Sequence, residues 1–224
     1  MSQRVLVIAA HPDDEALGCG GTLARHAMRG DTVDILFVAD GVSSRGADDA
    51  ALRRRRDAAQ RAAKCMGVNA PRFLEFPDNR LDSVPLLDIA QALEKVLGET
   101  GPAVVYTHHG GDLNVDHRVV HQAVMTALRP LPRSMTVGIF AFETLSSTEW
   151  ATGAIGEPFR PNYFVDITQS LEQKTRALAC YDEEMRAFPH PRSPEAVQAL
   201  VRLRGAASGL DAAEAYMTLR WIYR

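Results

Sequence analysis

Apolar runs that fit strands alternate with apolar patterns that fit helices over the first two thirds of the chain. The runs, of which the first two are typical of strands buried on both faces, lie at residues 5–10, 32–39, 72–76, 102–109 and 135–143. Between them apolar residues recur near helical spacing, which predicts helices at residues 16–28, 52–66, 85–97 and 115–128. This order favours an α/β fold with a doubly wound, mostly parallel sheet.

The pattern changes beyond residue 150. One late strand and three helices are predicted there, at residues 163–167, 170–186, 194–204 and 212–222. The length of 224 residues suits one large α/β domain, and neither a Gly- or Ser-rich linker nor an internal repeat divides the chain. We therefore expect a single domain over residues 1–224, with a core at about 1–145 and a helical C-terminal elaboration at about 146–224.

Composition and charge narrow the class of protein. Hydrophobic residues make up 46% of the chain and charged residues 24%, which allows a sizeable core. The net charge of −3 does not suit a nucleic-acid-binding surface. No apolar run approaches the ~20 residues that cross a bilayer, and the N-terminal run leads into HPDDE without a signal-peptide cleavage region. We expect a soluble, cytoplasmic protein with neither nucleic acid nor a membrane as its partner.

Neither the cysteines nor the glycines predict a cofactor site. Cys19, Cys65 and Cys180 are far apart in the sequence and odd in number, so reduced structural thiols are expected rather than disulfides or a thiolate metal cluster. The glycines of GCGG follow three acidic residues, which would repel the pyrophosphate of a dinucleotide. We expect these glycines to let the first helix pack closely.

Two segments that carry histidines each follow a predicted strand. The first is HPDDE at residues 11–15, and the second is YTHHGGDLNVDHRVVH at residues 106–121. In an open parallel sheet, ligands bind outside the carboxyl ends of the strands. Because both segments lie at such ends, we expect the fold to bring them together.

The residue types in these segments suit a divalent metal. Catalytic zinc takes three ligands of the His, Asp or Glu type and leaves a position for water. His11, Asp14 and His117 can supply these ligands, with Asp13 held beside them to accept a proton from the water. The alternative is a turn whose Asp residues cap the next helix. His121 has the four-residue spacing from His117 that paired zinc ligands show, but the first segment already supplies two ligands, so a supporting or structural role is expected.

AHPDDE, followed by DH at the head of a helix, resembles the PIG-L or LmbE-like zinc-dependent de-N-acetylases. The resemblance extends over nearly the whole chain and includes FLEFPDNRL, VDITQSLEQKTRAL and PHPRS. It implies a Rossmann-like three-layer α/β sandwich, with His11, Asp14 and His117 as the zinc ligands and Asp13 as the general base. It also implies that Asp116 orients a neighbouring histidine.

The sequence departs from many family members at one position of this motif. They read His-x-Asp-His, whereas this chain has Asn114 in NVDH. An asparagine can donate a hydrogen bond to an oxyanion but cannot act as a general acid near neutral pH. The proton for the leaving amine would then come from Asp13 itself, from His109 or, as a second candidate, from His190.

Substrate contacts are expected from two arginines and from His190. The family resemblance points to Arg55, twelve residues before Gly67. Arg55 also belongs to a run of four arginines, residues 53–56, that would suit a solvated helix turn. Tyr181 and Arg192 could reach over the site from the C-terminal helices, and His190 of PHPRS is a further candidate contact.

Together these features predict a zinc hydrolase that removes an N-acetyl group from an amino sugar or sugar conjugate. One Zn2+ per chain would polarise the amide carbonyl and activate water, although Fe2+, Co2+ or Mn2+ would also suit this ligand set. Two alternatives stay open: an amidase that cleaves a larger acyl group from a thiol or antibiotic conjugate, and a non-catalytic Rossmann-like ligand-binding protein. The sequence does not identify the sugar, and it is compatible with a homo-oligomer.

Overall fold

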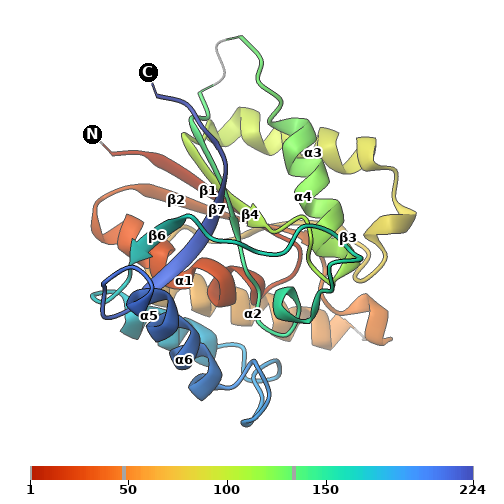
Figure 1. The fold of residues 1–224 in the computed structure, drawn as a ribbon. Coiled ribbons are helices and arrows are strands. Elements are labelled where there is room, and N and C mark those ends of the chain that lie inside the picture. Colours follow the sequence, from red (N-terminus) through yellow and green to blue (C-terminus); the bar gives the residue numbers. More distant parts are fainter. Residues whose placement is uncertain (1, 47–48, 133–134, 224) are drawn as a thin grey trace.

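A seven-stranded sheet runs through the centre of the molecule, described here from a computed structural model over residues 2–46, 49–132 and 135–223 (Figure 1). The strand order is β3-β2-β1-β4-β5-β7-β6. The strands are β1 (Arg4–Ala9), β2 (Thr32–Ala39), β3 (Arg72–Phe76), β4 (Val104–His108), β5 (Gly138–Phe142), β6 (Tyr163–Asp166) and β7 (Ala213–Trp221). The first five strands pair in parallel, whereas β7 runs antiparallel to both β5 and β6. The predicted mostly parallel sheet is confirmed.

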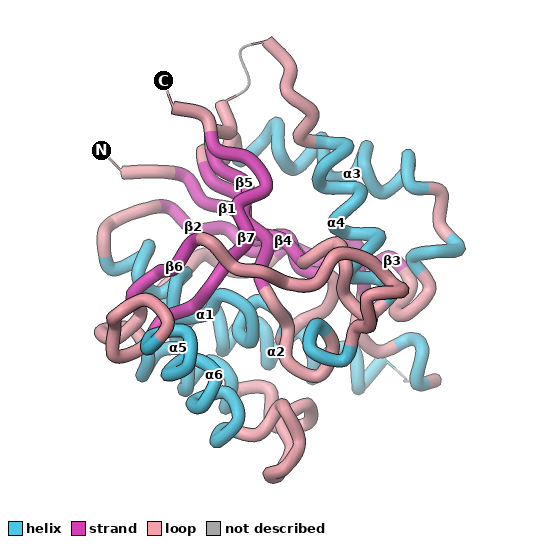
Figure 2. The backbone as a smooth tube through the Cα atoms, in the orientation of Figure 1, coloured by secondary structure: helices cyan, strands magenta, loops and turns pink. Residues whose placement is uncertain are grey.

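Helices cover both faces of this sheet. They are α1 (Asp14–Met28), α2 (Asp49–Met66), α3 (Leu86–Thr100), α4 (Val115–Ala127), α5 (Leu171–Ala179) and α6 (Pro194–Ala206). Short 3-10 turns lie at Ser43–Arg45, Leu81–Ser83 and Thr148–Trp150. Helices α3 and α4 lie on one face, and α1, α2, α5 and α6 lie on the other (Figures 1 and 2).

Alternate side chains of the strands build a separate core on each face. In β1, Val5 and Val7 belong to the core that contains apolar residues of α1, α2 and α5. Leu6 and Ile8 belong to the core that contains residues of α3 and α4. The three-layer α/β sandwich implied by the family resemblance is therefore confirmed.

The predicted helix over residues 212–222 is wrong, because this segment forms β7 between β5 and β6. Its alanine, glutamate, methionine and leucine residues favour a helix in isolation, but contacts with α1 decide the outcome. Glu214 accepts the backbone N–H of Thr22 at 2.7 Å, and the Tyr216 hydroxyl donates to the Thr22 hydroxyl at 2.5 Å. Two side chains that are two residues apart share one face only in a strand.

The C-terminal part of the chain is thus a mixture of strands and helices rather than a helical elaboration. It contributes β6 and β7 to the same sheet as the first five strands, and α5 and α6 to one face. The late strand expected at residues 163–167 is β6. The helix expected over residues 170–186 ends at Ala179, in α5.

Helix α1 lies unusually close to its neighbours because two of its residues have no side chain. A Cβ atom built on Gly18 would lie 2.3 Å from Cδ2 of Phe142 in β5, and one on Gly21 would lie 2.8 Å from Cδ1 of Ile167. The expectation that these glycines permit close packing is confirmed. The close packing holds the N-terminus of α1 over the carboxyl ends of the strands.

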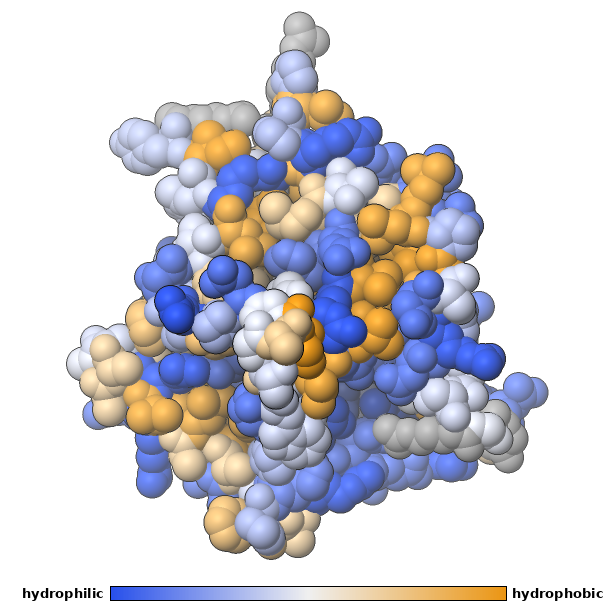
Figure 3. Space-filling model, turned by 45° about the vertical axis from the view of Figure 1, so that its right-hand side comes forward, coloured by the Kyte–Doolittle hydropathy of each residue, from blue (hydrophilic) through white to orange (hydrophobic). Residues whose placement is uncertain are grey.

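Hydrophilic residues cover much of the face drawn in Figure 3, with hydrophobic residues between them. Among the exposed large hydrophobic residues of the described chain are Leu87, Leu113, Phe188 and Trp221. Scattered exposed apolar side chains are normal for folded proteins. None of the described helices has the length and apolar character that crossing a membrane requires.

Candidate metal centre

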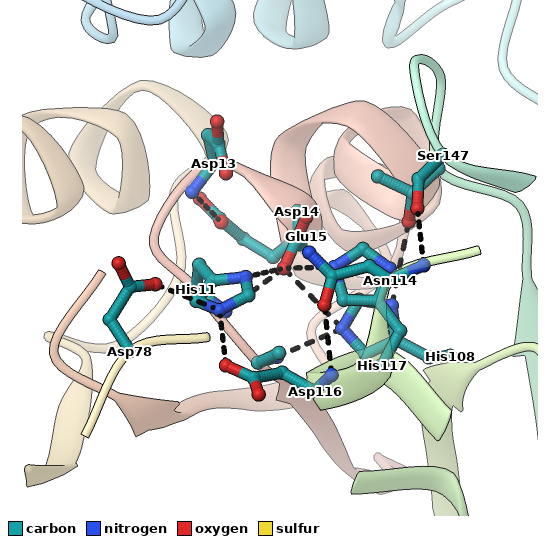
Figure 4. A network of polar contacts seen from close by, with 12 residues as sticks. His11, Asp13, Asp14, Glu15, Asp78, His108, Asn114, Asp116, His117 and Ser147 are labelled. Atoms are coloured by element: carbon teal, nitrogen blue, oxygen red, sulfur yellow. Dashed lines mark hydrogen bonds and ion pairs between the residues drawn. The ribbon is translucent and has the colours of Figure 1, made fainter. Parts of the chain in front are cut away.

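His11, Asp14 and His117 converge at the carboxyl ends of the central strands (Figure 4). His11 lies in the turn after β1, Asp14 is the first residue of α1, and His117 lies in the first turn of α4. Nδ1 of His11 and Nε2 of His117 each lie 3.3 Å from Oδ2 of Asp14. Each residue offers one ligand atom, and these atoms lie within 4.8 Å of one another. The fold therefore brings the two predicted segments together.

The surroundings of these three residues fit a divalent metal. Oδ1 of Asp14 is buried and has no hydrogen-bond partner, as expected for an atom that faces a cation. Nε2 of His11 donates to Oδ2 of Asp116 at 2.9 Å, and Nδ1 of His117 lies 3.1 Å from Oδ1 of Asp112. Histidines that bind metals commonly place their second nitrogen against a carboxylate. The described residues thus provide candidate ligands and carboxylates that contact them.

Burial and nearby opposite charges shift the pKa values of this cluster in opposite directions. Burial acts to lower the pKa of His117, but the charge of Asp14 and the contact with Asp112 outweigh it and raise the pKa to about 9. Burial acts to raise the pKa of Asp14, but His117 and His108 hold it well below its usual value. The site therefore favours a positive charge among its carboxylates, which protons or a metal ion can supply.

Asp116 is held in place by backbone groups, which makes it a rigid support for His11. Its Oδ2 accepts the N–H of Asn79 at 2.7 Å, and its Oδ1 accepts the N–H of Leu81 at 3.0 Å. Oδ1 of Asp78 also lies 3.1 Å from Nε2 of His11. Among the described residues, Asp116 thus contacts His11, the histidine that it would orient.

Asp13 occupies the strained position between the turn and α1. Its φ is 121°, and its side chain makes no capping hydrogen bond, although it stands at the N-cap of α1. Its N–H donates to Oε2 of Glu15 at 3.0 Å, and its Oδ2 lies 2.7 Å from Nη1 of Arg192. Burial raises the pKa of Asp13 against the lowering effect of Arg192 and Arg55. Figure 4 shows Asp13 above the meeting point of the three candidate ligands.

Arg55 and Arg192 both reach Asp13. Arg55 is buried, with Nη2 at 3.5 Å from Oδ2 of Asp13, and it also contacts Glu184. The interpretation of Arg55 as solvated helix surface is therefore wrong, although Arg53 and Arg54 beside it are exposed. Arg192 also donates from Nε to Oγ of Ser146 at 2.6 Å. Two guanidinium groups thus surround the candidate base.

The remaining predicted residues, Asn114, His109 and His190, differ in their hydrogen-bond partners. Asn114 is the N-cap of α4, and its Oδ1 accepts the N–H of Asp116 at 2.8 Å. His109 points elsewhere, because its Nε2 donates to the backbone carbonyl of Glu157 at 2.7 Å. Nδ1 of His190 accepts the backbone N–H of Arg192 at 3.0 Å. Asn114 is therefore integrated with the cluster, whereas His109 belongs to a neighbouring loop.

Comparisons with known proteins show the family to which the chain belongs. The profile of the PIG-L family, described as GlcNAc-PI de-N-acetylase, matches residues 6–128. The chain belongs to the PIG-L family. The uncharacterized deacetylase YaiS of Escherichia coli K12 is 33% identical over 174 residues, which are 75% of this chain and 89% of YaiS.

Two further similarities extend the comparison. A probable N-acetyl-alpha-D-glucosaminyl L-malate deacetylase 2 of Bacillus cereus is 27% identical over 198 residues, 84% of this chain and 86% of the relative. The solved structure of GalB, the 4-carboxy-2-hydroxymuconate hydratase of Pseudomonas putida KT2440, has a TM-score of 0.79 at 22% identity. That likeness covers 100% of this chain and 98% of GalB, and it concerns the fold alone.

Sequence reasoning assigned no role to three residues of this PIG-L site. Asp78 follows β3 and Asp112 follows β4, so the rule that sites form at strand ends could have found both. His108 stacks on His117 with ring centroids 3.8 Å apart. Its Nε2 accepts the backbone N–H of Ala10 at 2.8 Å, so that lone pair does not face a metal. Burial and the charge of His117 lower the pKa of His108 to about 4, which keeps it neutral.

His121 supports the cluster without joining it. Its Nδ1 donates to the backbone carbonyl of His108 at 2.8 Å. This hydrogen bond holds the strand end from which His108 packs on His117. The position agrees with the supporting role expected for His121.

Proposed function

We propose that this protein is a metal-dependent hydrolase that removes an N-acetyl group from an amino sugar or sugar conjugate. The observation that carries the proposal is the buried group of His11, Asp14 and His117, with Asp13 beside it, in a chain of the PIG-L family. The B. cereus relative named as a probable glucosaminyl malate deacetylase supports a small sugar conjugate as the substrate. The substrate would be neither a nucleic acid nor a membrane component.

His11, Asp14 and His117 would hold the metal, and zinc suits these donors. When bound, it would polarise the acyl carbonyl and lower the pKa of water. Iron, cobalt or manganese in the divalent state would also suit a mixed nitrogen and oxygen site. Asp116 and Asp112 keep the two histidines in position from the second ring nitrogen of each.

Asp13 would act as the general base. Its carboxylate takes one proton from the attacking water, whose oxygen forms the new bond to the acyl carbon. Arg55 and Arg192 hold that carboxylate in place and offer donors to the substrate. Asn114 would donate from its amide nitrogen to the oxyanion, because its oxygen is already used as the helix cap.

The amide C–N bond then breaks, and the amine leaves with a proton returned by Asp13. His190 is the alternative donor, because it belongs to the same loop as Arg192. His109 is less suited to this role, since its Nε2 already donates to Glu157. The products are acetate and the free amino sugar.

The test is acetate release from N-acetylated sugars, sugar nucleotides and acylated thiol conjugates by the zinc-loaded protein. Asp13→Asn should keep one metal per chain but lose roughly 100-fold or more in turnover, because it removes a proton acceptor and not a ligand. Asp88→Asn, an exposed carboxylate in the first turn of α3, is the matched control and should keep full activity.

Each other outcome has a defined meaning. Near-normal turnover by Asp13→Asn at saturating substrate would contradict the role of Asp13. Release of a larger acid without acetate would identify the amidase with a bulky acyl substrate. No release by the folded, metal-loaded protein would favour a ligand-binding protein. We also propose a cytoplasmic location, on the basis of the free thiols.

A further inference from the structure

Two of the three cysteines are neighbours in space although 115 positions separate them in the sequence. Sγ of Cys65, near the C-terminal end of α2, lies 3.8 Å from Sγ of Cys180, the residue that follows α5. Both are free thiols, and their closeness in space is not apparent from their separation in the sequence. The third thiol, Cys19, is fully buried in α1.

The pair is accessible to a small reagent, whereas Cys19 is not. Both Cys65 and Cys180 are partly exposed, and Cys19 has no exposed surface. The guanidinium of Arg61 donates to the backbone carbonyl of Cys180 at 3.2 Å, which places a positive charge beside the pair. Burial and the contact with Cys65 raise the pKa of the Cys180 thiol and outweigh the lowering effect of Arg61, so alkaline pH is needed to form the thiolate that reacts with oxidants.

The distance between the sulfur atoms suits a disulfide after a small movement. A disulfide has an S–S length of about 2.05 Å, so each sulfur would move by roughly 1 Å, which a side-chain rotation supplies. The two helices already pack against each other, because Ala62 and Ala63 of α2 share a core with Ala177 and Leu178 of α5. The fold thus pre-positions the thiols.

We propose that Cys65 and Cys180 form an oxidation site at which a peroxide produces an intramolecular disulfide between α2 and the end of α5. One thiolate attacks the peroxide, the O–O bond breaks, and the products are a sulfenic acid and one water or alcohol. The second sulfur then attacks the sulfenic sulfur, the S–S bond forms, and water leaves. The two thiols lose two electrons in total, and the peroxide gains them.

The cysteine pair lies on segments that also contact the surroundings of the candidate metal centre. Tyr181, the residue after Cys180, donates from its hydroxyl to Oε1 of Glu15 at 2.7 Å. Helix α2, which carries Cys65, also carries Arg55. The disulfide would therefore join the two segments that hold Glu15 and Asp13. Formation of this disulfide does not depend on the proposed function.

The test uses the full-length reduced protein and hydrogen peroxide at about pH 8.5, because burial raises the pKa of the Cys180 thiol. The number of free thiols measured after denaturation should fall from three to one, and the mass should fall by about 2 Da. Peptide mapping should find Cys65 linked to Cys180. A dithiol reductant should restore all three thiols.

Two single variants and a stability measurement complete the design. Cys65→Ser and Cys180→Ser should form no intramolecular disulfide, and dimedone should trap a sulfenic acid on the remaining partner. The oxidised parent should melt roughly 5 to 10 °C higher than the reduced parent, whereas neither variant should show this rise. Three thiols left in the treated parent, a disulfide that includes Cys19, or a link between two molecules would each contradict the proposal.

Discussion

Asp13 differs from the other buried carboxylates of the site in its backbone conformation. A φ of 121° is one that non-glycine residues rarely adopt, and such strain costs about 1–3 kcal/mol. It persists only where contacts hold it, and here Glu15 accepts the Asp13 N–H while Arg192 binds the carboxylate. A helix cap needs neither contact. The arrangement therefore supports the proposal that Asp13 is the general base.

The candidate ligands can be separated from their neighbours by metal content. His117→Ala should lose bound zinc, because only two of the three ligands remain. His121→Ala removes a histidine one turn later on the same helix and should keep about one zinc per chain, because its Nδ1 serves the backbone of His108. Elemental analysis after dialysis measures both. Equal zinc in the two variants would rule out His117 as a ligand.

The sequence predicts some residues of this site better than others. His11, Asp14 and His117 are predictable, because a short motif and two strand ends fix where they lie. The family resemblance implied that Asp116 contacts a neighbouring histidine, but it did not identify that histidine as His11. The support of His117 by Asp112 depends on the loop between β4 and α4, whose conformation no local pattern specifies.

At the scale of elements, a buried ion pair ties α5 to α1 and β7. Nζ of Lys174 lies 2.6 Å from Oε1 of Glu214 and donates to the backbone carbonyls of Ala16 and Leu17 at 2.9 and 2.7 Å. Lys174→Met should lower the free energy of unfolding by about 3–5 kcal/mol, because Glu214 keeps a buried charge without its partner.

Lys64→Met is the matched control for this change, because Lys64 is exposed on α2. Its effect on stability should stay within about 0.5 kcal/mol. Urea unfolding measures both variants. A similar small loss for Lys174→Met would show that the ion pair does not hold α5 against β7.

The close approach of α1 to β5 leads to a prediction about two glycines in the same helix. Gly18→Ala should destabilise the protein by about 1–3 kcal/mol, because its Cβ would overlap the Phe142 ring at 2.3 Å. Gly20→Ala should be neutral or stabilising by up to about 1 kcal/mol, because its Cβ would meet atoms only at 3.5 Å or more. Thermal unfolding of both variants measures the difference, and equal effects would contradict the close packing.

The elements themselves were predictable to different degrees. The strands and helices up to residue 143 follow from their own hydrophobic pattern, and each is found near its expected position. Strand β7 was mistaken for a helix because its residues favour helix locally, whereas Glu214 and Tyr216 find their partners in α1. Partners that lie almost 200 positions away leave no local signal.

At the scale of the whole molecule, the fold does not decide the reaction. GalB shares this fold with a TM-score of 0.79 and is a hydratase, whereas YaiS is named as a deacetylase. Proteins similar to this chain are therefore named for different reactions. The proposed reaction therefore rests on the candidate metal ligands and on Asp13 rather than on the fold.

A metal held by residues from the turn after β1, from α1 and from α4 should stabilise the entire fold. Ligand that binds only the folded state adds about 2.7 kcal/mol at 100 times its Kd, which corresponds to a rise of roughly 5 to 10 °C in Tm for a chain of this size. Zinc should therefore raise the Tm of the parent, and a chelator should reverse the rise. Asp13→Asn should keep this shift, because it leaves all three ligands in place, whereas His117→Ala should lose most of it. A full shift in His117→Ala would mean that zinc binds elsewhere on the molecule, and the assignment of the metal centre would then be wrong even if the protein proved to be a deacetylase.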